Sequence, residues 1–512
     1  MAIGSTLSVG LVGLKPFLIQ IQAFVSQGLP FFSIIGLPDA SLAEARERVK
    51  AACSAAGFHW PQTRVTVNMS PASLPKHGAT HDLAIAASVL AASRAIPSKC
   101  LDQTVVVGEV NLDGSVLPVH GILPVLLHAR QHGIRMAIVP RANADEAELV
   151  PDIDVFYVSH VGELIVLLGG NAVVPDTDVP ISATPPPTAA PALDQDVGDM
   201  AEVVQQQEAK WALQIAAAGG HHLLMVGPPG TGKTMLASRM PSIMCPLNEE
   251  EQFEVASIRS IVGTLQSFGI SDVPPFQAPH HTASVASIVG GGAGLAAPGA
   301  VTMAHRGVLF LDEAPEFGPR VLQTLREPLE SGTVAVSRSR GTTVFPARFQ
   351  LIMAANPCPC GYGYGSGERC TCRERDRIRY FSRLSGPILD RIDIQVAVLP
   401  TGRIDAGSTG SASNMSSKQM RHQVIAARQR ARERLKDEGW TCNAQASGSW
   451  LHQHTPARTL AIVNRALDAH VMSLRGADRA LRLAWTIADL DGVSEPSAEH
   501  MHAAIALRTK VT

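Results

Sequence analysis

Hydrophobic and polar positions along the first 170 residues alternate between strand-like and helix-like patterns. Apolar runs bounded by turn-forming residues predict strands at 33–36, 64–68 and 136–140. Two stretches rich in Ala and Leu predict helices at 81–94 and 123–133. Two further strands are expected to flank Asp113-Gly114. This alternation predicts one α/β domain over residues 1–170.

The rest of the chain divides at two stretches that lack a hydrophobic pattern. Residues 171–198 are rich in Pro, Ala, Thr and Asp, so they bury too little apolar surface to order themselves and predict a semi-rigid linker. A polar, Gly- and Ser-rich break at 407–417 precedes basic and amphipathic helical patterns. These breaks predict an α/β domain at 199–403 and a C-terminal helical domain at 404–512.

The central domain contains a glycine-rich turn between an apolar run and a helix. The octet Gly227, Pro228, Pro229, Gly230, Thr231, Gly232, Lys233 and Thr234 matches G-x-x-x-x-G-K-[ST], the P-loop pattern. Glycines there let backbone N–H groups close on phosphate oxygens. The motif predicts that Lys233 binds the β- and γ-phosphates of ATP and that the Thr234 hydroxyl is a ligand of Mg²⁺. A Gly- and Pro-rich surface turn is the alternative.

Two later apolar runs end in polar residues that would complete this site. The run 307–311 ends in Asp312 and Glu313, and the run 349–355 ends in Asn356. Because parallel strands of a doubly wound sheet meet at one edge, we expect these residues beside the P-loop. Asp312 is predicted as the second Mg²⁺ contact, Glu313 as the group that polarises the attacking water, and Asn356 as the group that holds it. A solvated strand end is the alternative for the two carboxylates.

Composition indicates where in the cell the protein acts but does not identify its partner. The 512 residues carry 43 Lys and Arg against 45 Asp and Glu, so any nucleic-acid surface must be a local patch. The chain does not open on a signal-peptide pattern and has no apolar run of about 18 residues, which favours a cytoplasmic protein without membrane contact. Eight cysteines in such a chain do not indicate a disulfide framework.

Two groups of residues have side chains that can bind metals. Two C-x-C pairs directly after Asn356 could make a tetrahedral thiolate site for Zn²⁺, although C-x₂-C is the commoner spacing. The pairs are Cys358 with Cys360 and Cys370 with Cys372. Unligated reduced thiols are the alternative. For His280 and His281 we expect a structural or loop role, because adjacent side chains on a strand point apart.

The N-terminal domain resembles the proteolytic domain of Lon in the order of its segments. The stretch 104–119 contains Gly-Glu, Gly and Leu-Pro in the Lon order and is followed by a predicted helix. Lon-type peptidases need a Ser nucleophile and a Lys general base. Alignment puts Thr80 at the Ser position and Val125 at the Lys position, and a Val side chain cannot accept a proton. We therefore expect a shared fold without peptidase activity.

Further segments occur with the P-loop in an order that is specific to one family. They include Ala278-Pro-His-His-Thr-Ala-Ser, Asn356-Pro-Cys-Pro-Cys-Gly and Leu384-Ser-Gly-Pro-Ile-Leu-Asp-Arg-Ile-Asp. Together the motifs resemble the magnesium-chelatase-like AAA+ ATPases, and specifically the ComM/YifB competence-protein family, over essentially the whole chain. The resemblance implies an α/β fold with a Lon-protease-like N-terminal domain, an AAA+ P-loop domain and a C-terminal helical lid. It also implies ATP and Mg²⁺ as cofactors and a homo-oligomer, expected to be a hexamer.

Arginines in two places match ATPase residues of this family. Arg391 matches the arginine finger that a neighbouring subunit inserts toward the γ-phosphate. An ion pair with Asp390 or Asp393 is the alternative. Arg475 best matches the second sensor of the nucleotide, with a plain solvated stripe as the alternative. The spacing i, i+4, i+7 puts three arginines on one helix face: Arg475, Arg479 and Arg482.

The resemblance implies an ATP-dependent DNA motor, similar in role to a branch-migration helicase of natural transformation and homologous recombination. An AAA+ remodeller of a protein or metal-insertion partner, as in magnesium chelatase, is the alternative. Residues 332–346 predict a β-hairpin with Arg338 and Arg340 near its tip. The two arginines are predicted to pair with phosphates of single-stranded or branched DNA without reading bases. An ordinary solvated hairpin is the alternative.

Overall fold

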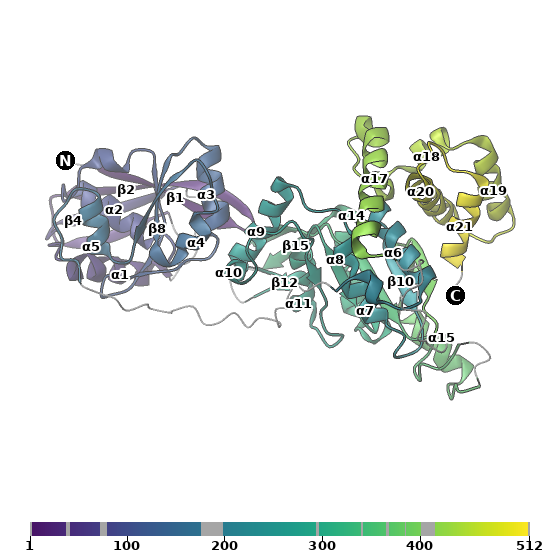
Figure 1. Cartoon of the computed structure of the whole chain (residues 1–512). Helices are drawn as coiled ribbons and strands as arrows, with labels where there is room; N and C mark the ends of the chain where they lie inside the picture. Colours follow the sequence, from purple (N-terminus) through teal and green to yellow (C-terminus); the bar gives the residue numbers. More distant parts are fainter. Residues whose placement is uncertain are drawn as a thin grey trace. The chain divides into compact units, whose positions relative to one another are not determined.

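The computed structural model describes residues 3–36, 41–71, 79–175, 198–292, 296–338, 341–364, 368–384, 386–400 and 415–509 (Figure 1). Contacts between residues divide the chain into two units. The first unit contains the described residues up to 175 together with Ala256–Ile270, and the second contains the other described residues. Most of the predicted linker at 171–198 and most of the break at 407–417 lie outside the described residues.

A seven-stranded sheet forms the centre of the first unit, in the order β3-β4-β2-β1-β5-β8-β9. Strands β1 and β2 pair antiparallel, whereas β5, β8 and β9 run parallel to one another. The strands are β1 (Ile3–Val12), β2 (Lys15–Ser26), β3 (Phe31–Ile35), β4 (Arg64–Ser70), β5 (Thr104–Val106), β8 (Met136–Pro140) and β9 (Asp154–Val158). The predicted strands around Asp113-Gly114 form a separate hairpin of β6 (Glu109–Val110) and β7 (Val116–Leu117).

Helix α2 (Asp82–Ala92) is buried along its whole length against this sheet. A Cβ at Gly4 would lie 2.1 Å from the carbonyl oxygen of Ser88, so β1 passes the helix at a distance that only glycine permits. Asp82 is buried at the start of the helix and accepts a hydrogen bond from Arg48 Nε at 2.8 Å. The other helices of this unit include α1 (Ser41–Ala55), α3 (Ile122–Gln131), α4 (Ala144–Ala147) and α5 (Val161–Leu167).

A five-stranded parallel sheet forms the centre of the second unit. Its order is β11-β14-β17-β10-β18. The strands are β10 (Leu223–Val226), β11 (Phe276–Gln277), β14 (Val308–Leu311), β17 (Gln350–Ala355) and β18 (Ile394–Ala397). Strands β10, β14 and β17 are buried at every position, which explains why they are continuous apolar runs. Their carboxyl ends share one edge of the sheet.

Helices and two hairpins connect these strands. The hairpins are β12 (Gly290–Gly291) with β13 (Ala297–Pro298), and β15 (Thr333–Arg338) with β16 (Gly341–Pro346). The longer helices are α6 (Gln207–Gly219), α9 (Glu249–Val262) and α15 (Glu374–Ser382). The shorter ones are α7 (Lys233–Ser238), α8 (Met240–Ile243), α11 (Val285–Val289), α12 (Ala300–Met303), α13 (Pro319–Thr324), α14 (Arg326–Ser331) and α16 (Gly386–Leu389). Helix α10 (Leu265–Phe268) and the second half of α9 belong to the first unit.

Helices at the C-terminal end of the chain share a hydrophobic core with this parallel sheet. They are α17 (Ser417–Leu435), α18 (Gly448–His454), α19 (Ala457–Asp468), α20 (Leu474–Asp491) and α21 (Ala498–Thr509). Helical patterns were predicted for this part of the chain, and the predicted fold class of α/β sheets followed by C-terminal helices is confirmed. Among the described helices, none has the length and apolar character needed to cross a membrane.

Asp393 connects helix α20 to the amino end of β18. Its buried carboxylate lies 3.1 Å from His221 Nδ1 and accepts a hydrogen bond from Arg479. Burial alone would raise the pKa of Asp393, but the hydrogen bond from His221 and the charges of His221 and Arg479 outweigh burial and hold the pKa well below its ordinary value. The carboxylate therefore stabilises the fold in its charged form.

We expect Asp393→Asn to destabilise the second unit by about 3 to 5 kcal/mol, because the substitution leaves the buried Arg479 contact without its charge partner. Thermal unfolding at neutral pH would measure this. The pKa is depressed in the folded state, so the stabilisation is present above about pH 4 and is lost as the pH falls below that value. Asp478→Asn, which removes a more exposed carboxylate on the same helix, is the control. Equal stability of the two variants would contradict the prediction.

Candidate functional site

The P-loop follows β10 at the carboxyl edge of the parallel sheet. A Cβ at Gly227 would lie 2.0 Å from the carbonyl oxygen of Val398, so the loop begins in close contact with the end of β18. Gly230 and Gly232 have φ values of +77° and +85°, a conformation that strains other residues. A Cβ at Gly230 would meet no heavy atom within 4 Å, so this turn is open on its outer side. The loop therefore has the backbone and the free space that a phosphate group needs.

Lys233 begins helix α7 and points back over the loop. Its Nζ donates to the carbonyl oxygens of Gly227 and Pro228, at 2.7 and 2.8 Å, and lies 3.3 Å from Asn356 Oδ1. Burial lowers the pKa of Lys233, and the charges of Asp312 and Glu313 oppose that effect. An anion bound in the loop would add favourable charge for this ammonium group.

Thr234 and Asp312 face each other across adjacent elements. The Thr234 hydroxyl donates to Asp312 Oδ2 at 2.6 Å, which joins the first turn of α7 to the end of β14. A hydroxyl oxygen and a carboxylate oxygen are hard ligands of the kind that Mg²⁺ prefers. The donor set on the two residues therefore fits the predicted metal.

Glu313 follows Asp312 in an unusual backbone conformation. Its φ is +50°, in the left-handed region, and its N–H donates to Asp312 Oδ1 at 2.9 Å. Its Oε2 lies 3.4 Å from His281 Nδ1. His280 and His281 lie in a loop, as expected, but their rings do not point apart as they would on a strand, because the two ring centroids are 4.1 Å apart. Sequence reasoning therefore missed His281 as a neighbour of Glu313.

Asn356 lies one residue beyond β17, beside Lys233. The structure thus brings together the residues that the sequence assigned to the ends of three strands: those of the P-loop, the two carboxylates and Asn356. They occupy one edge because β10, β14 and β17 are parallel neighbours. The arrangement can hold a phosphate chain and a divalent cation and can place a carboxylate near the terminal phosphate.

Arg391 lies beyond the amino ends of the strands of the same sheet, whereas the P-loop lies at their carboxyl ends. Arg391 precedes β18, whose first residue pairs with Leu223, whereas the P-loop follows the last residue of β10. The two ends are about 10 Å apart along the strands. The side chain forms an ion pair with Glu330 of helix α14, not with Asp390 or Asp393, which were the alternatives. Glu330 was not identified from the sequence, because it is close to Arg391 only in the folded chain.

The three arginines of α20 do not form one solvent-exposed stripe along the helix. Arg479 donates to Asp393 and to the carbonyl oxygen of Arg391, and Arg482 donates to the carbonyl oxygen of Ala446. Arg475 is exposed. Burial, followed by the positive charges of Arg326, Arg479 and Arg475, lowers the pKa of Arg391. Arg475 precedes Arg479 by one turn of α20, and Arg479 is the residue that contacts the Arg391 backbone.

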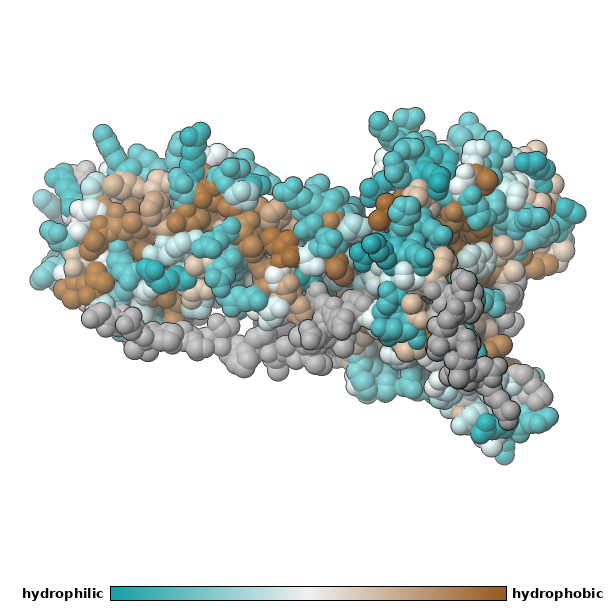
Figure 2. All heavy atoms as spheres, in the orientation of Figure 1, coloured by the Kyte–Doolittle hydropathy of each residue, from teal (hydrophilic) through white to brown (hydrophobic). Residues whose placement is uncertain are grey.

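The predicted hairpin exists as β15 and β16, which pair from Thr333 with Pro346 to Arg338 with Gly341. Arg338 is exposed near its tip, and one guanidinium nitrogen lies 2.7 Å from where a Cβ of Gly291 would be, on the neighbouring β12. Arg340 lies outside the described residues. The surface drawn in Figure 2 is hydrophilic over much of this second unit.

The four clustered cysteines lie in the loop between Asn356 and α15. All four sulfur atoms are within 4.8 Å of one another. Cys358 is buried, and Cys360, Cys370 and Cys372 are half-buried. The sequence prediction that these four thiols could share one ion is therefore geometrically possible.

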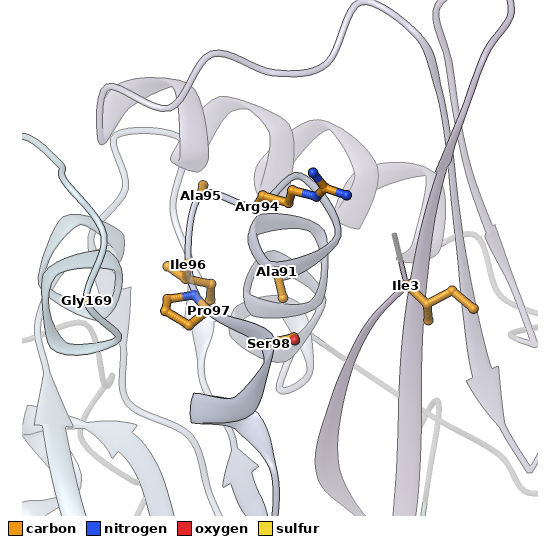
Figure 3. A pocket seen from close by; sticks show the side chains of 8 residues that line it. All are labelled: Ile3, Ala91, Arg94, Ala95, Ile96, Pro97, Ser98 and Gly169. Atoms are coloured by element: carbon orange, nitrogen blue, oxygen red, sulfur yellow. The ribbon is translucent and has the colours of Figure 1, made fainter. Parts of the chain in front are cut away.

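Among the described residues of the first unit, Thr80 and Val125 do not provide the Ser and Lys pair of a Lon-type peptidase. Val125 is buried in α3, and the carbonyl oxygen of Thr80 accepts a hydrogen bond from the Gly108 N–H. A cavity of about 390 Å³ lies near the end of α2, and its lining residues include Ile3, Arg94 and Ser98 (Figure 3). Neither Thr80 nor Val125 lines this cavity.

Comparison with known families matches three consecutive parts of the chain. The family described as "Magnesium chelatase, subunit ChlI" matches residues 199–405. "Subunit ChlI of Mg-chelatase" matches residues 21–143, and "Magnesium chelatase, subunit ChlI C-terminal" matches residues 414–508. A Lon protease of Thermus thermophilus is 32% identical over 134 residues, which are 24% of this chain and 16% of that protein. The predicted partial similarity to Lon is confirmed.

Full-length relatives are more similar than these partial matches. The uncharacterized protein Rv2897c of Mycobacterium tuberculosis is 42% identical over 99% of both chains. The competence protein ComM of Haemophilus influenzae is 37% identical over 98% of this chain and 96% of its own, and the uncharacterized protein YifB of Escherichia coli is 38% identical over 96% and 94%. With this coverage and the ordered family matches, the chain belongs to the ComM/YifB family of magnesium-chelatase-like AAA+ proteins.

Proposed function

We propose that the protein is an ATP-hydrolysing ring motor that moves DNA. The observation that supports a multi-subunit ATPase best is the placement of the P-loop and Arg391 at opposite edges of one parallel sheet. A site that needs both groups is incomplete in one chain, so a second copy must supply Arg391. The resemblance to AAA+ proteins suggests a hexamer.

Within one subunit, the residues at the carboxyl edge divide the work of hydrolysis. The P-loop backbone and Lys233 bind the phosphates, while Asn356 and Glu313 orient a water molecule for attack on the γ-phosphate. When bound through Thr234 and Asp312, Mg²⁺ would neutralise charge on the phosphate oxygens. His281 lies 3.4 Å from Glu313 and is the residue that we propose positions this carboxylate.

From the neighbouring subunit, Arg391 and Arg475 act together on the same nucleotide. Arg475 lies one turn before Arg479 on α20, and Arg479 donates to the carbonyl oxygen of Arg391 at 2.8 Å, which supports a shared role. Two permanent positive charges suit a transition state with charge spread over three oxygens. Within its own chain, Arg391 forms an ion pair with Glu330.

We propose that the β15–β16 hairpin contacts DNA and that the protein acts in the cytoplasm. It lies between the strand that carries Asp312 and Glu313 and the strand that leads to Asn356, so a change at the γ-phosphate can move it. Arginines at its tip would pair with phosphates independently of sequence. The relative ComM is named a competence protein, and that name is consistent with an activity on DNA.

We expect the double variant Arg338→Ala, Arg340→Ala to keep ATP hydrolysis without DNA, to bind every DNA sequence more weakly, and to lower the salt slope of binding by about 2. Binding of labelled single-stranded and branched DNA at several salt concentrations would measure this. The matched control is Arg458→Ala, Arg465→Ala, which removes two exposed arginines from α19.

Unchanged DNA affinity and unchanged stimulation of hydrolysis by DNA in the hairpin variant would rule out the hairpin as the contact. If the parent protein also hydrolysed ATP without any response to DNA, the second candidate would gain. That candidate is a remodeller of a protein or metal-insertion partner, which the matches to magnesium chelatase subunits support.

A further inference from the structure

The four thiols after Asn356 are arranged around one point. Cys358 Sγ lies 3.3 Å from Cys360 Sγ and 3.7 Å from Cys370 Sγ, and the latter two sulfur atoms are also 3.7 Å apart. Cys372 Sγ completes the group within 4.8 Å of the others. None of the four is in a disulfide.

These separations fit a single tetrahedral ion. Four sulfur atoms at about 2.3 Å from one Zn²⁺ are about 3.8 Å from one another. An iron–sulfur cluster would bind the same thiolates through several iron atoms and so spread them further apart. Zn²⁺ is the ion that most often takes four thiolates in this closed geometry.

We propose that Cys358, Cys360, Cys370 and Cys372 bind one structural Zn²⁺, and that this ion fixes the loop after Asn356 against the P-loop. The first part concerns metal binding alone. The second part rests on the proposed binding of ATP at the P-loop.

The backbone around the first C-x-C pair is shaped for a thiolate. The Gly363 N–H donates to Cys358 Sγ at 3.1 Å, and the Gly361 N–H donates to the Cys358 carbonyl oxygen at 2.9 Å. Gly361 ends this turn with a φ of +82°, in the left-handed region that favours glycine. The second pair ends two residues before helix α15, whose amino end favours negative charge. Such N–H contacts orient ligands and offset the charge of four thiolates.

The same loop touches the nucleotide site at two points. A Cβ at Gly361 would lie 2.5 Å from Pro229 Cδ, so the loop packs directly on the P-loop. Asn356, two residues before Cys358, lies 3.3 Å from Lys233 Nζ. An ion that links Cys358 to Cys372 therefore restricts the movement of Asn356 and Pro229. Without the ion, both contacts would loosen.

Metal content tests the first part on the full-length protein, purified with a reducing agent and without a chelator. We expect about one zinc and no stoichiometric iron per chain by elemental analysis. Cys360→Ser and Cys370→Ser should each lose most of the zinc, while Cys100→Ser, which removes an exposed thiol outside the cluster, should keep it. Absence of zinc in the parent, iron in its place, or full zinc retention in both cluster variants would overturn the site.

A second measurement does not depend on folding of the variants. Titration of the parent protein with a mercurial reagent should release zinc in proportion to the modification of four thiols, detected with a zinc-sensitive dye. Growth with Co²⁺ should give the visible absorption of tetrahedral thiolate coordination. Zinc release that does not track thiol modification would count against the cluster as the ligand set.

Equilibrium binding of a fluorescent ATP analogue to zinc-loaded and zinc-depleted protein tests the second part. We expect affinity to fall by about tenfold or more on depletion, because displacements of about 1 Å can be costly where geometry matters. Re-addition of Zn²⁺ should restore the affinity. Equal affinity of both forms would overturn the proposal that the ion fixes the loop after Asn356 against the P-loop. If zinc-loaded protein bound no nucleotide, the proposed function would be contradicted instead.

Discussion

Lys233→Ala protein is expected to bind no ATP at concentrations that saturate the parent, and Glu313→Gln protein is expected to bind ATP and hydrolyse it about 10²- to 10⁴-fold more slowly. Lys233 Nζ sits over the P-loop within hydrogen-bond distance of its carbonyl groups, so its loss removes the charge that would meet the phosphates. Glu313 contacts no P-loop atom through a hydrogen bond in the described structure, so its loss should spare binding. Equilibrium nucleotide binding and steady-state phosphate release would separate the two effects.

Glu316→Gln is the matched control for Glu313→Gln, since it neutralises an exposed carboxylate that lies three residues on and pairs with Arg383. This control should keep both binding and turnover. If Glu313→Gln hydrolysed ATP at the parental rate, Glu313 would not be the residue that activates water. If Lys233→Ala still bound ATP with parental affinity, the phosphates would not lie over this loop.

Local sequence was sufficient to predict the carboxyl-edge site, because each part of it is a short motif attached to a buried strand. The P-loop octet needs no partner to be recognised, and Asp312 and Asn356 follow apolar runs that are buried at every position. Parallel pairing of β10, β14 and β17 then brings the motifs together without further information. The hairpin at Thr333–Pro346 was predicted for a similar reason, since both of its strands alternate.

Contacts between distant segments could not be predicted, because no local pattern encodes them. The pairs Arg391 with Glu330, Glu313 with His281 and Gly361 with Pro229 join residues 32 to 132 positions apart. The sequence also suggested that His280 and His281 point apart, which would hold on a strand but not in the turn that they occupy. In each case the tertiary neighbour, and not residue type or spacing, determines the contact.

Arg391→Ala is expected to lower ATP turnover by about 10³-fold or more, as removal of other arginine fingers does, with nucleotide binding retained. Arg391 precedes β18 at the end of the strands opposite the P-loop of its own chain, so we expect it to act on the P-loop of a neighbouring subunit. Arg465→Ala, which removes an exposed arginine that bonds to the carbonyl oxygen of Ala461 within its own helix, is the control for charge loss. The control should hydrolyse ATP at the parental rate.

Mixing Arg391→Ala with Lys233→Ala subunits tests whether the site is shared. The first variant has an intact P-loop and the second an intact Arg391, so rings assembled at random from equal amounts should contain up to about a quarter of complete sites. Turnover of the mixture should then exceed that of either variant alone. Glu330→Ala, which removes the ion pair with Arg391, should not lower turnover, because Arg391 and not Glu330 is the proposed finger. Failure of confirmed mixed rings to regain activity would show that Arg391 acts within its own chain or not at the nucleotide.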